Sequence, residues 1–91
     1  MNFEWDPGKA TQNRRKHRVS FHEAATVFGD PFSATYPDPD HSTSEERFIT
    51  FGISSAGRVL IVAYVDRNEV IRIISARETT QREREQYEEN N

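Results

Sequence analysis

The sequence predicts an α+β domain: an antiparallel sheet with two N-terminal helices on one face and a C-terminal helix, in the order β-α-α-β-β-β-α. Three strand-like segments follow one another between residues 47 and 76, separated by two short turns, which is typical of an antiparallel meander. Helix-start signals precede them. At 91 residues the chain has room for one domain, which we expect to span residues 1–91.

The first elements expected are a strand and a helix. Residues 2–5 alternate polar and apolar side chains, which favours a short strand. Asp6 and Pro7 then provide an N-cap and a first helical residue, and the helix is expected to run to about His17. The basic residues 14–18 suit a helix C-terminus, where cations interact favourably with the helix dipole.

The second helix has the clearest start signal in the chain. Ser20 and Glu23 form a capping box, and Gly29 and Pro31 end the helix. Four apolar residues recur at helical spacing and give the helix one apolar face: Phe21, Ala24, Ala25 and Phe28.

The second half of the chain predicts a loop and then three strands. Residues 30–44 are rich in Pro, Asp and Ser, so we expect a loop there. Within this segment, only residues 33–36 could form an edge strand. Tight turns are expected at 54–57 and 66–69. The three strands are expected at residues 47–53, 58–65 and 70–76.

Residues 79–91 predict a polar C-terminal helix. Thr80 and Glu83 repeat the capping-box pattern, and Tyr87 is the only large apolar residue of the segment. A helix with so narrow an apolar face packs weakly, so we expect it to fray or to dock with a partner. Hydrophobic residues make up only 34% of the whole chain, which predicts a thin core that gains from a partner chain.

Composition excludes several classes of protein. The chain has no cysteine, which excludes disulfide scaffolds, zinc ribbons and thiol catalysis. No apolar run reaches the roughly 20 residues of a membrane span. The N-terminus has Trp5 and Asp6 where a signal peptide has its apolar stretch. We therefore expect a cytoplasmic protein that does not contact membranes.

The net charge of −3 argues at first against nucleic-acid binding, but the charges are unevenly distributed. Residues 1–20 carry five basic and two acidic side chains, and residues 47–77 again carry five and two. Residues 21–46, between them, carry six acidic side chains and no basic one. If the two basic blocks converge in the fold, they form a cleft that binds phosphate even on an acidic protein.

Motifs for metal binding, phosphate loops and serine hydrolysis are missing. His22 and Glu23 begin a zincin-like pattern, but Thr26 stands where the second histidine is needed. The four glycines are scattered, and no Gly-x-Ser-x-Gly elbow occurs. We therefore expect no metal ion and no cofactor.

The remaining candidate residues are basic or polar. Lys9, Asn13 and Lys16 fall on one face of the first predicted helix. Three arginines, whose guanidinium groups suit bidentate phosphate contacts, lie on or beside predicted strands: Arg47, Arg72 and Arg77. The alternative is a solvated helix face with ordinary strand-end charges. Arg72 fits that alternative least, because an unpaired charge in an aliphatic strand is costly to bury.

The chain resembles the BrnT family of type II toxins over almost its whole length. The matching segments are FEWDP at 3–7, KATQN at 9–13, KHRVSF at 16–21, EA at 23–24, FGDP at 28–31, DHS at 40–42, EERF at 45–48, GRV at 57–59, RIISAR at 72–77, ER at 83–84, and Tyr87. Two positions depart from the family pattern. Arg18 stands where the family often has Gly, and Glu78 stands where it often has Lys, which removes a positive charge beside the expected cleft.

The resemblance implies a RelE-like ribonuclease toxin of a type II toxin–antitoxin system that stops translation. It also implies a BrnA-like antitoxin with a ribbon-helix-helix domain, which neutralises the toxin. The complex is expected to be a hetero-oligomer, a heterotetramer, that represses its own operon and contacts DNA only through the antitoxin.

Such a reaction fits the residues without a metal, because RNA carries its own nucleophile, the 2′-hydroxyl. The enzyme must align this group with the phosphate, accept its proton, stabilise the added charge and protonate the leaving 5′-oxygen. We expect Arg47, Arg72 and Arg77 to stabilise the charge, with Lys16 adding to it. Lys9 and Asn13 are expected to bind RNA.

Two further side chains have a catalytic and a structural interpretation. His17 is a candidate acid or base, because histidine ordinarily titrates near neutrality; the alternative is a helix-end residue that caps carbonyls. Tyr87 either stacks on a base or supplies a proton, or it anchors the last helix. Trp5 is expected in the core rather than on a base.

Two other functions remain open at the level of sequence. The chain is either a non-catalytic binding module whose basic cleft grips RNA or a peptide, or a structural partner in an operon-repressing complex. RNA cleavage by the purified chain, lost in a folded Arg variant, distinguishes the ribonuclease from both.

Overall fold

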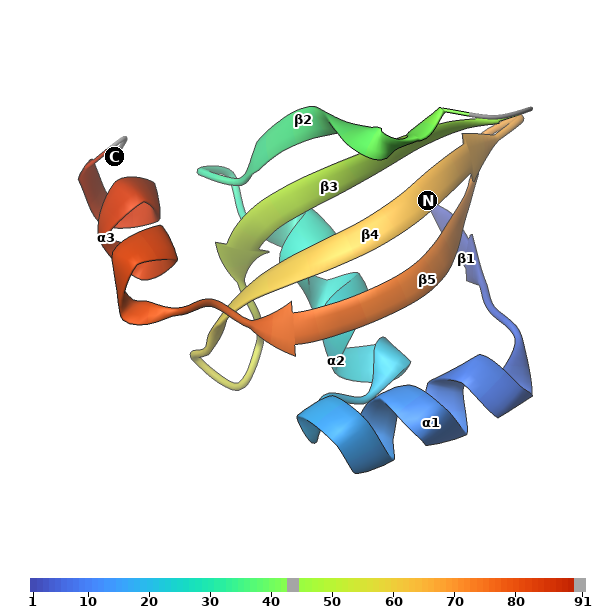
Figure 1. The fold of residues 1–91 in the computed structure, drawn as a ribbon, viewed down its shortest axis with the longest axis horizontal. Helices are drawn as coiled ribbons and strands as arrows, with labels where there is room; N and C mark the ends of the chain where they lie inside the picture. Colours follow the sequence, from blue (N-terminus) through green and yellow to red (C-terminus); the bar gives the residue numbers. More distant parts are fainter. Residues whose placement is uncertain (43–44, 90–91) are drawn as a thin grey trace.

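The computed structural model describes residues 1–42 and 45–89, with the backbone only for 39–42. Its elements are β1 (Asn2–Glu4), α1 (Pro7–His17), α2 (Phe21–Thr26), the 3₁₀ turn η1 (Val27–Gly29), β2 (Ala34–Ser42), β3 (Glu46–Ile53), β4 (Val59–Arg67), β5 (Val70–Glu78) and α3 (Gln81–Glu89). The α+β class is confirmed. In Figure 1, α1 and α2 cover one face of the sheet, while α3 lies beyond the ends of β3 and β5.

The sheet has five strands in the order β1-β5-β4-β3-β2. The predicted meander of β3, β4 and β5 is confirmed as antiparallel. The sheet as a whole is mixed and not purely antiparallel, because β1 pairs with β5 in parallel, with Phe3 opposite Ile71. This pairing joins segments far apart in the chain, which local patterning cannot indicate.

A nine-residue strand, β2, occupies most of the segment expected to be a loop, so the predicted element order was one strand short. It pairs with β3 through Ala34, Thr35, Tyr36 and Pro37, after which the register shifts before Ser42. Because β2 is an edge strand, proline is tolerated there: only one side of the strand has a neighbour to pair with. The turn residues that suggested a loop therefore mark an edge strand.

The core lies between the helices and one face of the sheet. Phe21, Val27 and neighbouring apolar residues of the helical segment pack against Leu60, Val62 and Ile73. Trp5 packs at the margin of this core, with its ring centroid 5.9 Å from that of Phe21, in an edge-to-face arrangement. The expectation that Trp5 belongs to the core is confirmed.

The local start signals of both N-terminal helices are confirmed. The Asp6 carboxylate accepts a hydrogen bond from the Lys9 N–H at 2.9 Å, and the Ser20 hydroxyl accepts one from the Glu23 N–H at 3.0 Å. Helix α1 ends at His17, and the next residue, Arg18, caps it in a left-handed conformation with φ of 58°. None of the described helices is long and apolar enough to cross a membrane.

A β-bulge in β5 decides which face its arginines share. Ala63 pairs with Ser75 and Tyr64 with Ile73, so Ile74 is the extra residue. Without the bulge, side chains five positions apart would lie on opposite faces. With it, Arg72 and Arg77 stand opposite Val65 and Ile61, which lie on one face of β4. The bulge therefore puts both arginines on the face turned away from α1 and α2.

Asn13 connects α1 to β5 beyond the end of β1. Its side chain is buried, and its Nδ2 donates to the carbonyl oxygens of Val19 at 3.0 Å and Ala76 at 2.8 Å. Its Oδ1 accepts from the Ala76 N–H at 3.1 Å. The amide thus pairs with the edge of β5 as a strand would, and fixes the last turn of α1 beside the bulge.

Candidate functional site

The face of the sheet turned away from α1 and α2 has a cleft of about 370 Å³. It receives side chains from the end of α1, from four strands and from the start of α3: His17, Asp38, Arg47, Ile49, Phe51, Ile61, Ala63, Ser75, Ala76, Arg77 and Glu83. The strand residues form rows across the sheet. Phe51, Ile61 and Arg77 are paired in one row, and Ile49, Ala63 and Ser75 in the next. The cleft thus has an apolar floor and a polar rim.

A second, shallower hollow of about 270 Å³ continues along α1. Lys9, Gln12, Asn13 and Lys16 line it, and His17 and Ser75 line both hollows. The two basic segments of the sequence therefore meet here. His17, at the junction, is half-buried, whereas Lys9 and Lys16 are exposed.

Arg47 lies in the cleft and is half-buried. Among the described residues, its Nε–H is the buried side-chain group without a hydrogen-bond partner. A buried donor without an acceptor costs about 1–3 kcal/mol, so an oxygen atom of a bound ligand would be favoured there.

Arg77 is held by a bidentate ion pair with Glu83 at the start of α3. Its Nη1 lies 2.9 Å from Oε1 of Glu83, and its Nη2 lies 3.1 Å from Oε2. The Arg77 guanidinium lowers the pKa of Glu83 to about 2, assisted by hydrogen bonds from Thr80. Glu83 is therefore ionised at neutral pH and orients Arg77 within the cleft.

Arg72 lies on the same face as Arg77 but does not line the cleft. Its Nη1 is 3.5 Å from Oε1 of Glu4, its partner across the parallel β1–β5 pair. Val65 separates Arg72 from Arg47 in one row of the sheet. Adjacent strands lie about 4.8 Å apart, which puts the two arginine backbones roughly 10 Å apart. Arg72 therefore extends the positive charge of the face beyond the cleft.

Tyr87 also lies outside this cleft. Its hydroxyl donates a hydrogen bond to Oδ2 of the buried Asp30, which also accepts backbone N–H bonds from Phe32 and Ile53. Burial and the Asp30 carboxylate raise the pKa of Tyr87 to about 12. In this arrangement Tyr87 anchors α3 to the corner before β2. This contact matches the structural interpretation of Tyr87, in which it anchors the last helix.

Neither of the two departures from the family pattern, Arg18 and Glu78, lines the cleft. Glu78 is paired with Leu60, on the helix-covered face, and its carboxylate bonds Arg58 at 2.8 Å. Arg58 also donates to the carboxylate of Glu23 and to the Arg18 carbonyl oxygen. These ion pairs raise the pKa of Arg58. Glu78 therefore joins a structural ion-pair cluster and does not reduce the charge of the open face.

Three polar residues of the cleft were not among the predicted site residues: Asp38, Ser75 and Glu83. Asp38 lies on the strand that was expected to be a loop, and the face of Ser75 depends on the bulge. Glu83 was identified only as a helix cap, a role it also fills by accepting from the Thr80 N–H at 2.8 Å. Among the described residues, no three His, Asp or Glu side chains are grouped to hold a metal ion.

Comparison with known proteins identifies the family. The family model described as the ribonuclease toxin, BrnT, of type II toxin–antitoxin systems matches residues 5–83. The 1.1 Å crystal structure of the Brucella abortus ribonuclease toxin, BrnT, is similar with a TM-score of 0.69. It is 20% identical, covers 89% of this chain and 99% of that one, and so shares the fold. No curated protein matches in sequence. Because the family model matches most of the chain, this protein belongs to the BrnT family of ribonuclease toxins of type II toxin–antitoxin systems.

Proposed function

We propose that the chain is a metal-independent endoribonuclease toxin that cleaves RNA in the cleft of the open sheet face by attack of the substrate's own 2′-hydroxyl. The main support is the meeting of His17, Arg47 and Arg77 in one cleft, where the buried Nε–H of Arg47 lacks an acceptor among the described residues. A phosphate oxygen is a strong acceptor for a guanidinium group.

The reaction needs charge stabilisation at the phosphorus. As the 2′-oxygen bonds to phosphorus and the bond to the 5′-oxygen breaks, negative charge grows on the non-bridging oxygens. Arg47 and Arg77 are the two guanidinium groups that line the cleft. We assign them to these oxygens, with Glu83 orienting Arg77 through its two hydrogen bonds.

The reaction also needs proton transfer at two oxygens. The 2′-hydroxyl loses a proton, and the departing 5′-oxygen gains one, giving a 2′,3′-cyclic phosphate and a 5′-hydroxyl. His17 lines the cleft, and we assign its imidazole group to one of these transfers. Glu83 is a poor base, because Arg77 holds its pKa at about 2.

RNA flanking the reacting phosphate would follow the basic surface on either side. Lys9 and Lys16 are exposed along the α1 hollow, and Arg72 extends the face in the other direction. Charged contacts of this kind fix the position of the backbone without reading its sequence. We assign Asn13 to holding α1 and Tyr87 to holding α3, because their polar groups bond within the chain.

The chemistry of the proposed site supports metal independence. Its guanidinium and imidazole groups supply positive charge and proton transfer, the two contributions that a divalent ion would otherwise make. The nucleophile belongs to the substrate and needs no activation by a metal-bound water.

The toxin would act on RNA in the cytoplasm and inhibit translation. A protein antitoxin is implied by the type II family. We propose that it is BrnA-like, with a ribbon-helix-helix domain that makes the DNA contacts of a heterotetrameric, operon-repressing complex. In this account one surface, the cleft lined by Arg47 and Arg77, binds both RNA and the antitoxin.

The experiment that tests the proposal is cleavage of an end-labelled RNA by the purified chain in EDTA. We expect cleavage at the same rate with and without EDTA, and products ending in a 2′,3′-cyclic phosphate. A single 2′-deoxy nucleotide at a mapped cleavage site should abolish cleavage at that site alone. Cleavage that persists at the 2′-deoxy position, or that requires a divalent ion, would contradict the mechanism.

A further inference from the structure

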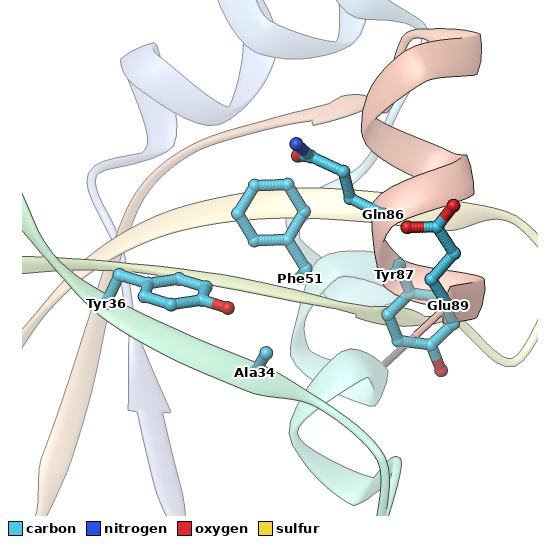
Figure 2. A pocket seen from close by; sticks show the side chains of 6 residues that line it. All are labelled: Ala34, Tyr36, Phe51, Gln86, Tyr87 and Glu89. Carbon is cyan, nitrogen blue, oxygen red and sulfur yellow. The ribbon is translucent and has the colours of Figure 1, made fainter. Parts of the chain in front are cut away.

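The sheet face turned away from α1 and α2 has another cavity, of about 450 Å³, next to the cleft that holds Arg47 and Arg77. Ala34, Tyr36 and Phe51 line it from β2 and β3, and Gln86, Tyr87 and Glu89 line it from α3 (Figure 2). Phe51 lines both this cavity and the cleft, so the two lie next to each other. The volume lies within the range of about 300–1,000 Å³ typical of sites for small organic groups.

The sheet side of this cavity is aromatic and open. Tyr36 is 47% exposed, although large apolar residues ordinarily favour burial. Its ring centroid lies 6.0 Å from that of Phe51, with the planes at 85°. Ala34, paired with Phe51 across β2 and β3, is small and leaves room beside the two rings. A flat ring could therefore stack on Tyr36 or pack against the edge of Phe51.

The helix side of the cavity is polar. Figure 2 shows the Gln86 side chain reaching from α3 toward the ring of Phe51, with Glu89 one turn of the helix away. An amide both donates and accepts hydrogen bonds, whereas a carboxylate only accepts. The Glu89 carboxylate also repels phosphate, so the cavity suits the base of a nucleotide and not its backbone.

We propose that this cavity is a subsite for one unpaired nucleobase of the RNA substrate, with Tyr36 and Phe51 as the stacking surface and Gln86 as the residue that reads the edge of the base. The inference rests on the proposed ribonuclease function, because the cleft next to it must hold the phosphate. Proteins recognise single-stranded RNA by this combination of aromatic stacking and edge hydrogen bonds.

The geometry and the charge also indicate which base is preferred. Phe51 lies two strands from Arg77 in one row of the sheet, roughly 10 Å between backbones, so the base belongs at or next to the cleaved linkage. Gln86 matches the donor–acceptor edge of adenine, and a carboxylate such as Glu89 accepts from an exocyclic amino group. We therefore expect a base with an amino group, adenine above all, to be favoured over uracil.

The test measures stacking and cleavage separately. A short oligonucleotide of 2′-deoxy nucleotides, which cannot be cleaved, carries 2-aminopurine at one position after another, and its fluorescence is followed as the full chain is added. We expect quenching at one position only. Tyr36→Leu should weaken binding of that oligonucleotide roughly 5- to 150-fold, the range for loss of one stacked base, while Tyr36→Phe retains binding. Phe32→Leu, which removes an exposed aromatic ring that does not line the cavity, is the control.

Cleavage of a pool of random single-stranded RNA gives the second measurement. We expect an adenine preference at one position near the cut in the wild type, and loss of that preference in Gln86→Leu. Quenching that is absent or insensitive to Tyr36→Leu, or a Gln86→Leu cleavage profile equal to that of the wild type, would refute the subsite. If RNA is cleaved but none of these effects is seen, the proposed ribonuclease function stands and the proposed base subsite is refuted. Quenching that depends on Tyr36, without any cleavage, supports the subsite and refutes the ribonuclease.

Discussion

Replacing Asn13 by alanine tests whether this residue holds the site together or binds RNA. Its amide makes three hydrogen bonds, two to the backbone of Ala76 and one to the carbonyl oxygen of Val19. Asn13→Ala removes all three and leaves the Ala76 N–H and both carbonyl groups without these partners. The change also releases the last turn of α1, which bears His17, from β5.

The cost follows from the number of bonds lost. A net contribution of about 0.5–1.5 kcal/mol per hydrogen bond gives an expected loss of about 2–4 kcal/mol in the free energy of unfolding. Small domains have about 5–15 kcal/mol in total, so this is a large fraction. For a domain of this size it corresponds to a fall in Tm on the order of 10–30 °C.

Urea unfolding followed by Trp5 fluorescence measures this loss. We expect a lower midpoint with an unchanged dependence on urea concentration. Gln12→Ala, a change at the neighbouring exposed position that lines the same hollow, is the matched control and should alter stability by less than about 0.5 kcal/mol. A stability of Asn13→Ala within that limit, with RNA binding weakened, would refute the structural role and support the original prediction of an RNA contact.

Three further predictions concern the helix ends. Arg18→Gly should raise the stability by about 0.5–1 kcal/mol in urea unfolding, because glycine adopts the φ of 58° without a Cβ clash; a decrease would contradict this. Glu83→Gln should be less stable than the wild type at neutral pH, and the difference should vanish as the pH falls through and below about 2, since the folded-state pKa of Glu83 is depressed below its unfolded value; a difference independent of pH would contradict the ion pair with Arg77. Tyr87→Phe should speed amide hydrogen exchange in α3, because the bond to Asp30 is lost; unchanged exchange would show that α3 is held by other contacts.

Local signals in the sequence predicted most of the fold, and pairing between distant segments accounts for the rest. The caps at Asp6 and Ser20 depend on neighbouring residues, and both are confirmed. The parallel pairing of β1 with β5 depends on distant residues, and the prolines of β2 are tolerated only because that strand lies at the edge of the sheet. Neither condition is visible in a local pattern.

The candidate site also divides into features that local sequence signals predict and features that depend on the fold. The residue types and the two basic blocks pointed to His17, Arg47 and Arg77, which the fold brings into one cleft. Whether Arg72 and Arg77 share a face could not be predicted, because the answer depends on a single extra residue in β5. The helical spacing predicted that Asn13 shares a face with Lys9 and Lys16, and all three line the α1 hollow. The spacing could not show that the Asn13 amide is buried against Ala76.

The central claim is that the arginines of the cleft stabilise a cleaving phosphate, and single-turnover RNA cleavage by Arg47→Gln tests it most directly. Arg47 makes a favourable target because its buried Nε–H has no partner among the described residues, so its removal should cost little stability. We predict a rate about 100- to 1,000-fold below that of the wild type, with an unchanged urea midpoint. Arg84→Gln, at an exposed position of α3 outside the cleft, should cleave like the wild type. A rate for Arg47→Gln within a few-fold of the wild type would contradict the assignment of this cleft as the site of RNA cleavage.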